Sequence, residues 1–521
     1  MNLKTRFQTV LILFMVLGLI VSHQVLAQGR QAPPPEYKEL VAASEIKDAA
    51  ARIKEFERIK AAYPNSQFLV AIDGSIMEAK IELAETLDSV VSLQSEFMAK
   101  AKGPARLQNP IMAADQILGH PRLGSFDKAA VLSVVLKYRE EALRAAEDPA
   151  TYEGIPEDRR GFFKSQFVNG FEIAAAKAYL NAGDAVKAMA ALEGYRKAGG
   201  AADGNYFYTL AGVEEKLNKN REAYEAYLAA SVDNFADAKD RAKALYVKIN
   251  GRADGFEAVL EAKLKALPFH PEAFKAPADW KGKAVLAELF TGSECPPCVG
   301  ADLGFDGLVE SVPAKYLAIL VYHLPIPRPD PMMNPATKMR QDVYGVNSTP
   351  TVFFDGANKM VGGGNRGMAE GKFAEYKAAV EPLLSAAPEV SLKVRASLSG
   401  ETVKASYEFD KTVPGAEYHV VLVQAEQEHK GSNGLVSHKM VVRDLVTVDP
   451  AAPKTLTFDL AASEKAVDAY LTEFEKTYTR VPNFKWAARR NAIPRQGLKV
   501  VFFVQDKETK KVLNAVVADV K

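Results

Sequence analysis

The chain contains only two cysteines, Cys295 and Cys298, and two prolines separate them. Two thiols at this spacing can close a small disulfide ring and reopen it by exchange with another thiol. Lys283 to Phe290 precedes them as a short apolar strand, and the segment from Cys295 onward is predicted to open a helix. Free backbone N–H groups and the dipole at a helix N-terminus favour the nucleophilic thiolate. We therefore predict thiol–disulfide chemistry, with Cys295 as the nucleophile and Cys298 as the more buried, resolving thiol.

A second motif supports this interpretation. The run Gly345-Val346-Asn347-Ser348-Thr349-Pro350-Thr351 follows, and its Pro350 lies 55 residues after Cys295. Together, the Cys-x-x-Cys after a strand and this Gly-Val-x-x-Thr-Pro-Thr run resemble the thioredoxin superfamily. The resemblance implies a thioredoxin-like α/β domain at 274–385, in which a cis-proline loop packs beside the cysteines. It also implies that Thr349 and Pro350 shape and bind the backbone of an extended substrate peptide.

Several polar residues near the motif have both a functional and an ordinary interpretation. Glu288 lies on the strand that enters the site and is a candidate proton acceptor for the resolving thiol, or simply a solvated strand residue. His323 follows the next strand and either satisfies a local hydrogen bond or takes part in the redox chemistry. His419, His429 and His438 have spacings of ten and nine, which fit no familiar zinc pattern. No metal and no cofactor are predicted. Gly362-Gly363-Gly364 is predicted to be the turn before a closing helix rather than a phosphate cradle.

The region 37–270 is rich in Ala, Glu, Lys and Leu at helical spacing. Two stretches that begin at Gly183 and Asn218 look alike and lie 35 residues apart, near the tetratricopeptide period of about 34. Small residues, Ala188 and Ala223, stand at the expected helix–helix contact. We predict tetratricopeptide-like helical repeats with a face for a protein partner, and an irregular helical bundle is the alternative.

The region 390–521 is read as seven strands separated by turns, with a helical insertion near 463–490. This pattern predicts an immunoglobulin-like β-sandwich as a separate domain. The run from Tyr322 to Pro335, together with Gly431-Ser432-Asn433-Gly434, resembles a family of secreted, outer-membrane-associated thioredoxin-like proteins of bacteria. That resemblance implies an envelope location and a β-domain after the thioredoxin-like one. The whole chain is thus predicted to be multidomain.

The N-terminus has the pattern of a secretory signal peptide at 1–27. Lys4 and Arg6 precede an apolar run from Val10 to Val21, and the sequence predicts cleavage near Ala27. An uncleaved anchor is the alternative, although the run is short for a span of about 20 residues. No cysteine stands directly after this apolar run, which excludes a lipoprotein. A linker at 28–36 follows, and no later stretch is predicted to span a membrane, so the mature chain is expected in a periplasm or outside the cell.

The charge balance of the chain argues against one class of function. The 66 Lys+Arg residues nearly balance 65 Asp+Glu, for a net charge of +1, which gives no support to a nucleic-acid binder. We predict an extracytoplasmic thiol–disulfide oxidoreductase that acts on protein thiols or disulfides and exchanges electrons with a redox partner protein. The alternative is a non-enzymatic binding or assembly protein of the envelope, in which Cys295 and Cys298 form a structural disulfide.

Overall fold

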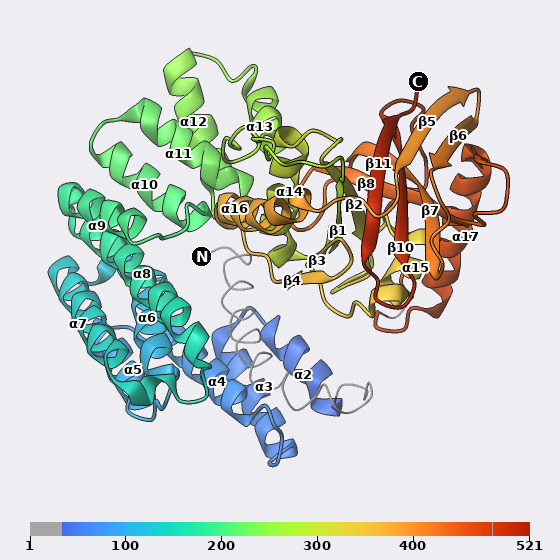
Figure 1. Ribbon diagram of the computed structural model, residues 1–521. Helices are drawn as coiled ribbons and strands as arrows, with labels where there is room; N and C mark the ends of the chain where they lie inside the picture. The colour runs from blue at the N-terminus through green and yellow to red at the C-terminus, as the bar shows by residue number, and fades with distance from the viewer. Residues whose placement is uncertain (1–33, 482) are drawn as a thin grey trace. The chain divides into compact units, whose positions relative to one another are not determined.

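The computed structural model describes residues 34–481 and 483–521, which divide between two compact units, Met1–Ala253 and Asp254–Lys521 (Figure 1). The predicted signal peptide and the first part of the predicted linker lie outside the described residues. That linker ends earlier in the chain than predicted. Pro34 is extended, but α2 (Pro35–Ser44) already begins at the next residue, because a proline fits the first turn of a helix.

The first unit is helical throughout its described part, as the sequence predicts. After α2 its helices are α3 (Ala49–Ala62), α4 (Leu69–Leu83), α5 (Leu87–Met98), α6 (Ala105–Leu118), η1 (Leu123–Ser125), α7 (Lys128–Ala146), η2 (Pro149–Tyr152), α8 (Glu157–Ala182), α9 (Ala185–Lys197), α10 (Gly204–Lys216), α11 (Asn220–Val232) and α12 (Ala238–Asn250).

The two similar stretches of sequence occupy equivalent places in this unit. One leads into α9, which packs on α8, and the other leads into α11, which packs on α10. Ala188 and Ala223 are both 0% exposed, in agreement with their predicted place between packed helices. Asp184 caps α9 by accepting the N–H of Lys187, whereas α11 begins without a side-chain cap. The predicted 35-residue period is therefore a period of helix pairs.

The second unit begins with α13 (Phe256–Lys265), so the last predicted helix of the 37–270 region belongs to it. The elements that follow are β1 (Val285–Thr291), η3 (Pro296–Cys298), α14 (Val299–Ser311), β2 (Leu317–His323), α15 (Pro335–Tyr344), β3 (Thr351–Phe354), β4 (Asn358–Val361), η4 (Arg366–Met368), α16 (Ala369–Val380), η5 (Glu381–Ser385), β5 (Leu392–Ser399), β6 (Thr402–Phe409), β7 (Ala416–Glu428), β8 (Ser437–Val448), β9 (Thr455–Asp459), α17 (Leu460–Thr477), β10 (Leu498–Asp506) and β11 (Val512–Asp519).

One mixed sheet runs through this unit, in the order β11-β10-β7-β8-β2-β1-β3-β4. β1 lies between β2, with which it pairs in parallel, and β3, with which it pairs antiparallel. β4 is antiparallel to β3. All seven residues of β1 and all seven of β2 are buried, as expected for central strands covered on both faces. The ends of β1 and β2 are level, because Thr291 pairs with His323.

The two faces of β1 meet different helices. Thr291 hydrogen-bonds to Asp302 of α14, whereas Glu288 hydrogen-bonds to Arg340 of α15. Side chains three positions apart on a strand point to opposite faces. Therefore α14 covers one face of β1 and α15 covers the other, and α16 packs beside α14 (Figure 1).

The prediction of a separate β-sandwich at 390–521 is corrected by this sheet. All seven predicted strands are present, but β7, β8, β10 and β11 extend the sheet of β1 to β4 rather than forming their own domain. Only β5, β6 and β9 form a second sheet, which packs on the first through ring contacts such as Tyr407 with Phe502. The join is the parallel pairing of β2 with β8 at Val321 and Val441. A pairing between strands so far apart in the chain leaves no local signature in the sequence.

The predicted helical insertion is also adjusted. Its helix, α17, covers 460–477, and the rest of the predicted stretch up to 490 has no helix in its described part. No helix within residues 34–481 and 483–521 is both long and apolar enough to cross a membrane.

Candidate functional site

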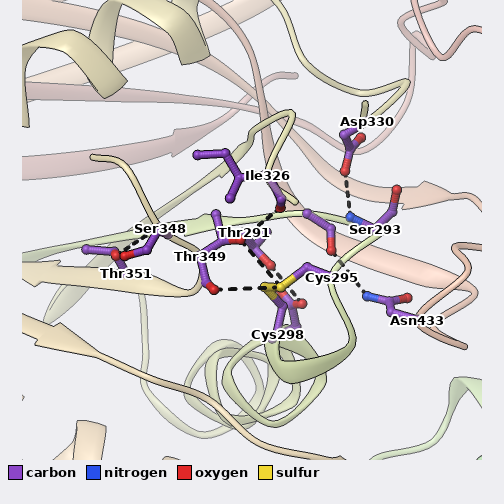
Figure 2. The surroundings of a disulfide bond; sticks show 12 residues. Thr291, Ser293, Cys295, Cys298, Ile326, Asp330, Ser348, Thr349, Thr351 and Asn433 are labelled. Carbon is purple, nitrogen blue, oxygen red and sulfur yellow. Dashed lines mark hydrogen bonds between the residues drawn. A yellow bond between two sulfur atoms is a disulfide. The ribbon is translucent and has the colours of Figure 1, made fainter. Parts of the chain in front are cut away.

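Cys295 and Cys298 form a disulfide where β1 gives way to α14 (Figure 2). The short 3-10 turn η3 precedes the helix, so α14 itself begins directly after Cys298. Cys295 and Cys298 are 1% and 0% exposed, whereas Pro296 and Pro297 are exposed. The expected difference in burial between the two thiols is therefore small, and the two prolines form the open rim of the site.

The loop around Pro350 lies directly beside the disulfide. The Thr349–Pro350 peptide bond is cis. The hydroxyl Oγ1 of Thr349 is 3.4 Å from Sγ of Cys295 and donates to the carbonyl of Ile326 at 2.8 Å. Figure 2 shows Thr349 between the sulfur atoms and Ile326. The structure thus brings together all four residues predicted from the two motifs: Cys295, Cys298, Thr349 and Pro350.

The turn Gly362-Gly363-Gly364, which follows β4, packs against the Cys-Pro-Pro-Cys motif. The N–H of Gly364 donates to the carbonyl of Pro297 at 2.7 Å, and the N–H of Gly300 donates to the carbonyl of Gly364 at 2.8 Å. A Cβ at Gly363 would lie 2.0 Å from the carbonyl oxygen of Pro297. The turn before the closing helix is as predicted, but its glycines also allow the close approach that holds the motif in place.

The loop between β7 and β8 covers the other side of the motif. Asn433 donates its N–H to the carbonyl of Ser293 at 3.1 Å and its side-chain amide to the carbonyl of Gly292 at 3.3 Å. Ser432 donates its N–H to the carboxylate of Glu294 at 3.3 Å. The segment Gly431 to Gly434, which the sequence links only to a family resemblance, is therefore a wall of the site.

Glu288 lies in a buried network away from the disulfide. Its Oε1 accepts both Nε and Nη2 of Arg340, at 3.0 and 2.7 Å, and the hydroxyl of Tyr322 at 3.0 Å. Its Oε2 accepts the hydroxyl of Tyr344 at 2.5 Å. Because Glu288 points to the α15 face of β1, it does not face the helix that carries Cys298. Its position argues against the predicted role as proton acceptor and, since it is 0% exposed, against the solvated alternative.

Asp302 is the carboxyl group that sequence reasoning missed. It lies on α14 one turn after Cys298, so the two side chains share a helix face. Oδ2 of Asp302 accepts the hydroxyl of Thr291 at 2.9 Å. Burial raises the pKa of Asp302 well above its ordinary value, and the Thr291 hydroxyl only partly opposes this effect. The spacing Cys-x-x-x-Asp at a helix start is the signal that could have identified it.

Three histidines gather on the same face of the sheet. The His323 ring lies 5.1 Å from that of His438, centroid to centroid, and the His438 ring lies 6.0 Å from that of His429. His419 lies elsewhere, on β7 beside Thr447. In the part of the chain that the structure describes, no group of three or more His, Cys, Asp or Glu residues is arranged to hold a metal ion.

Comparisons with known proteins add little to this geometry. No family model matches the chain, and no curated protein matches it. Among solved structures, the chain is similar to HBP35 of Porphyromonas gingivalis, with 13% identity over 47% of this chain and 77% of that one, and a TM-score of 0.30. At this TM-score the likeness transfers neither a fold nor a function.

Proposed function

We propose that the chain is an extracytoplasmic thiol–disulfide oxidoreductase with a thioredoxin-like redox site in its second unit. The observation that carries this proposal is the contact of the cis Thr349–Pro350 loop with Cys295, 3.4 Å from Oγ1 to Sγ, although 54 residues separate Thr349 from Cys295. A cysteine pair between a strand and a helix, with such a loop beside it, supports the resemblance to the thioredoxin superfamily.

The exchange needs no cofactor. A substrate thiolate attacks Sγ of Cys295, the Cys295–Cys298 bond breaks, and its electron pair goes to Sγ of Cys298. A second substrate thiol then attacks the mixed disulfide and releases Cys295. In the opposite direction Cys295 attacks a substrate disulfide and Cys298 resolves the mixed disulfide. Asn347 and Ser348 are exposed next to Thr349, so an extended peptide can pair with this backbone.

A second candidate function is a binding or assembly role in which the disulfide is structural. The observation that favours it is the burial of both sulfur-bearing residues, at 1% and 0% exposure. Structural disulfides resist reduction, with potentials below about −300 mV, whereas redox-active pairs of this kind lie at about −120 to −270 mV.

The reduction potential of the Cys295–Cys298 pair therefore separates the two functions. We expect equilibration of the mature protein with glutathione or dithiothreitol buffers to give a value within about −120 to −270 mV. Alkylation of the reduced protein against pH should also reveal a thiolate at Cys295 with a lowered pKa. A potential below about −300 mV, together with thiols that do not alkylate, would favour the structural role.

Single cysteine variants test the order of events. Cys295→Ser should abolish exchange, and Cys298→Ala should accumulate mixed disulfides with substrate proteins on a non-reducing gel. The double variant Cys295→Ser/Cys298→Ala is the matched control, because it should form no mixed disulfide. Turnover that survives in Cys295→Ser would contradict the assignment.

The other parts of the proposal concern place and partners. We propose cleavage near Ala27 and a periplasmic or secreted mature protein, and N-terminal sequencing of the mature chain tests both. The helix pairs α8–α9 and α10–α11 support a tetratricopeptide-like surface for a protein partner. Substrates would be protein thiols or disulfides, and a separate redox protein would renew the pair.

A further inference from the structure

His323 ends β2 and belongs to a buried pair with Asp330. Nδ1 of His323 lies 2.9 Å from Oδ2 of Asp330, and both side chains are 0% exposed. The same carboxylate oxygen accepts the N–H of Ser293 at 2.6 Å, and Oδ1 accepts the N–H of Met332 at 2.8 Å. Figure 2 shows the bond from Ser293 to Asp330, beside the disulfide. Asp330 therefore connects the histidine ring to the residue two positions before Cys295.

These contacts decide which atom of His323 is free to exchange a proton. Burial opposes charge on Asp330, but the His323 ring and the two backbone N–H donors outweigh it and hold the pKa of Asp330 below its ordinary value. A charged Asp330 keeps the proton of His323 on Nδ1. Nε2 is buried and has no hydrogen-bond partner among the residues that the structure describes. It is thus the nitrogen that can gain or lose a proton.

A small cavity connects His323 to the helix of the disulfide. His323 lines it together with Asp302 and Asp306 of α14 and His438 of β8. The cavity leaves about 10 Å³ for the centre of a water molecule, which is roughly the room that one water needs. Asp302 and Asp306 lie four residues apart on one face of α14, and Cys298 stands four residues before Asp302 at the start of that helix.

Burial changes the pKa values of the acidic groups and of one histidine around this cavity. Burial raises the pKa of Asp302 well above its ordinary value and that of Asp306 to about 7. Burial and the neighbouring His323 lower the pKa of His438 to about 3, so His438 stays neutral. Other titratable or charged groups on the elements packed here are Lys439, Glu310, Glu426, Glu294, His429, Arg490, Arg366 and Tyr376.

We propose that His323, oriented by Asp330, supplies and removes the proton of Cys298 through Asp302 and one water in this cavity. The proposal rests on the proposed function. When a substrate thiolate opens the disulfide, Cys298 leaves as a thiolate and takes a proton from Asp302, which His323 replaces. In the opposite direction His323 first takes the proton of Asp302. The Cys298 thiol then passes its own proton to the Asp302 carboxylate, attacks the mixed disulfide and releases the substrate thiolate. The substrate dithiol or disulfide supplies or takes up the two electrons.

His323 does not touch the sulfur atoms in this scheme, and Asp330 is a positioning residue that acts through it. The experiment therefore measures the reduction rate of the full-length mature protein by dithiothreitol from about pH 6 to 9, in water and in D₂O. Its variants are His323→Gln and Asp330→Asn. His419→Gln is the matched control, because His419 is also a buried histidine of this unit but does not line the cavity.

We expect His323→Gln to slow reduction at neutral pH by about tenfold or more, since general acid–base groups contribute about 10²–10⁴-fold. It should also remove one ionisation from the pH profile and lower the solvent isotope effect. Asp330→Asn should shift that ionisation, and His419→Gln should leave both readouts unchanged. A wild-type pH profile in His323→Gln would overturn the relay.

Two further outcomes keep the test decisive. If the variants do not fold, ¹⁵N NMR spectra of the wild-type histidines provide the test. Identical ¹⁵N chemical shifts of His323 at every pH in the oxidised and reduced protein would overturn the relay. If dithiothreitol does not reduce the folded wild-type disulfide at all, the proposed function itself fails. A wild type that reacts, beside a His323→Gln variant that reacts equally well, overturns the relay alone.

Discussion

Two buried carboxyl groups lie on opposite faces of β1, and their hydrogen-bond partners suit them to different roles. Glu288 is bound by Arg340 and two tyrosine hydroxyls, so its charge is compensated where it lies. Asp302 accepts a hydrogen bond from the hydroxyl of Thr291, and burial raises the pKa of Asp302. A carboxyl group with a raised pKa suits acid–base chemistry, whereas one held in a buried ion pair suits stability.

Asp302→Asn should make the stability of the second unit less dependent on pH. The pKa of Asp302 in the folded protein lies above the ordinary value of 3.8, so the folded state binds this proton more tightly than the unfolded state. Stability from this group is therefore complete below about pH 4 and falls as the pH rises through the raised folded pKa. Asparagine carries no charge, so the variant should lose this decrease in stability at higher pH.

Urea unfolding at pH 4 and pH 8 checks this prediction. The variant is expected to gain stability relative to the wild type only at pH 8. Both tryptophans, Trp280 and Trp486, belong to the second unit, so their fluorescence reports this unit alone. An equal difference at both pH values would contradict it. Exchange by the same variant should slow by about 10²-fold or more.

Arg340→Met should destabilise the second unit by about 3–5 kcal/mol, because it leaves the Glu288 carboxylate buried without its counter-ion. Glu288→Gln/Arg340→Met should recover part of that loss, since no unpaired charge remains. Tryptophan fluorescence in urea measures both. If Glu288 were the proton acceptor instead, the folded double variant would exchange disulfides as slowly as Asp302→Asn.

At the scale of elements, three loops surround the disulfide, and their contacts use backbone groups as well as side chains. The loop before β3 supplies Thr349, the turn after β4 supplies the glycines, and the loop between β7 and β8 supplies Asn433. Because backbone groups make many of these contacts, the shape of each loop matters more than most of its side chains.

Gly363→Ala should displace the turn from the motif, since its Cβ would lie 2.0 Å from the carbonyl oxygen of Pro297. Forced overpacking of this kind costs about 1–3 kcal/mol. Gly371→Ala on α16 is the matched control, because a Cβ there meets nothing within 4 Å. The control should be neutral or stabilise the helix by up to about 1 kcal/mol.

Thermal unfolding and the reduction potential measure the effect of Gly363→Ala. We expect both to change in this variant and the potential to stay constant in Gly371→Ala. An unchanged Gly363→Ala protein would mean that the turn yields without disturbing the disulfide.

At the scale of the molecule, the redox site depends on strands that come after it in the chain. Residues from Val285 to Leu384 share one hydrophobic core with residues from Val421 to Ala515. The sheet continues from β2 into β8, β7, β10 and β11. The predicted boundary between the regions 274–385 and 390–521 is therefore not a point at which the unit can be divided.

A chain that ends at Ser385 should consequently fail to fold its redox unit, because β2 loses its neighbour and the shared core is exposed. Residues 254–521 alone should fold and keep the potential of the full protein. Solubility, near-UV circular dichroism and the potential of each fragment check this. A soluble, cooperatively folded protein that ends at Ser385 would contradict the shared core.

The sequence by itself determined the local features of this protein. The Cys-Pro-Pro-Cys pair, the Thr349–Pro350 run, the repeated helix pairs and the seven late strands are all readable, because each depends on residue type and on spacings within a few turns of chain. The pairing of Val321 with Val441 was decided only by the tertiary structure, as was the choice between Glu288 and Asp302. So were the pairing of His323 with Asp330 and the gathering of His323, Asp302 and His438 around one cavity. Contacts between distant segments depend on which faces become buried together, and burial is a property of the folded chain as a whole.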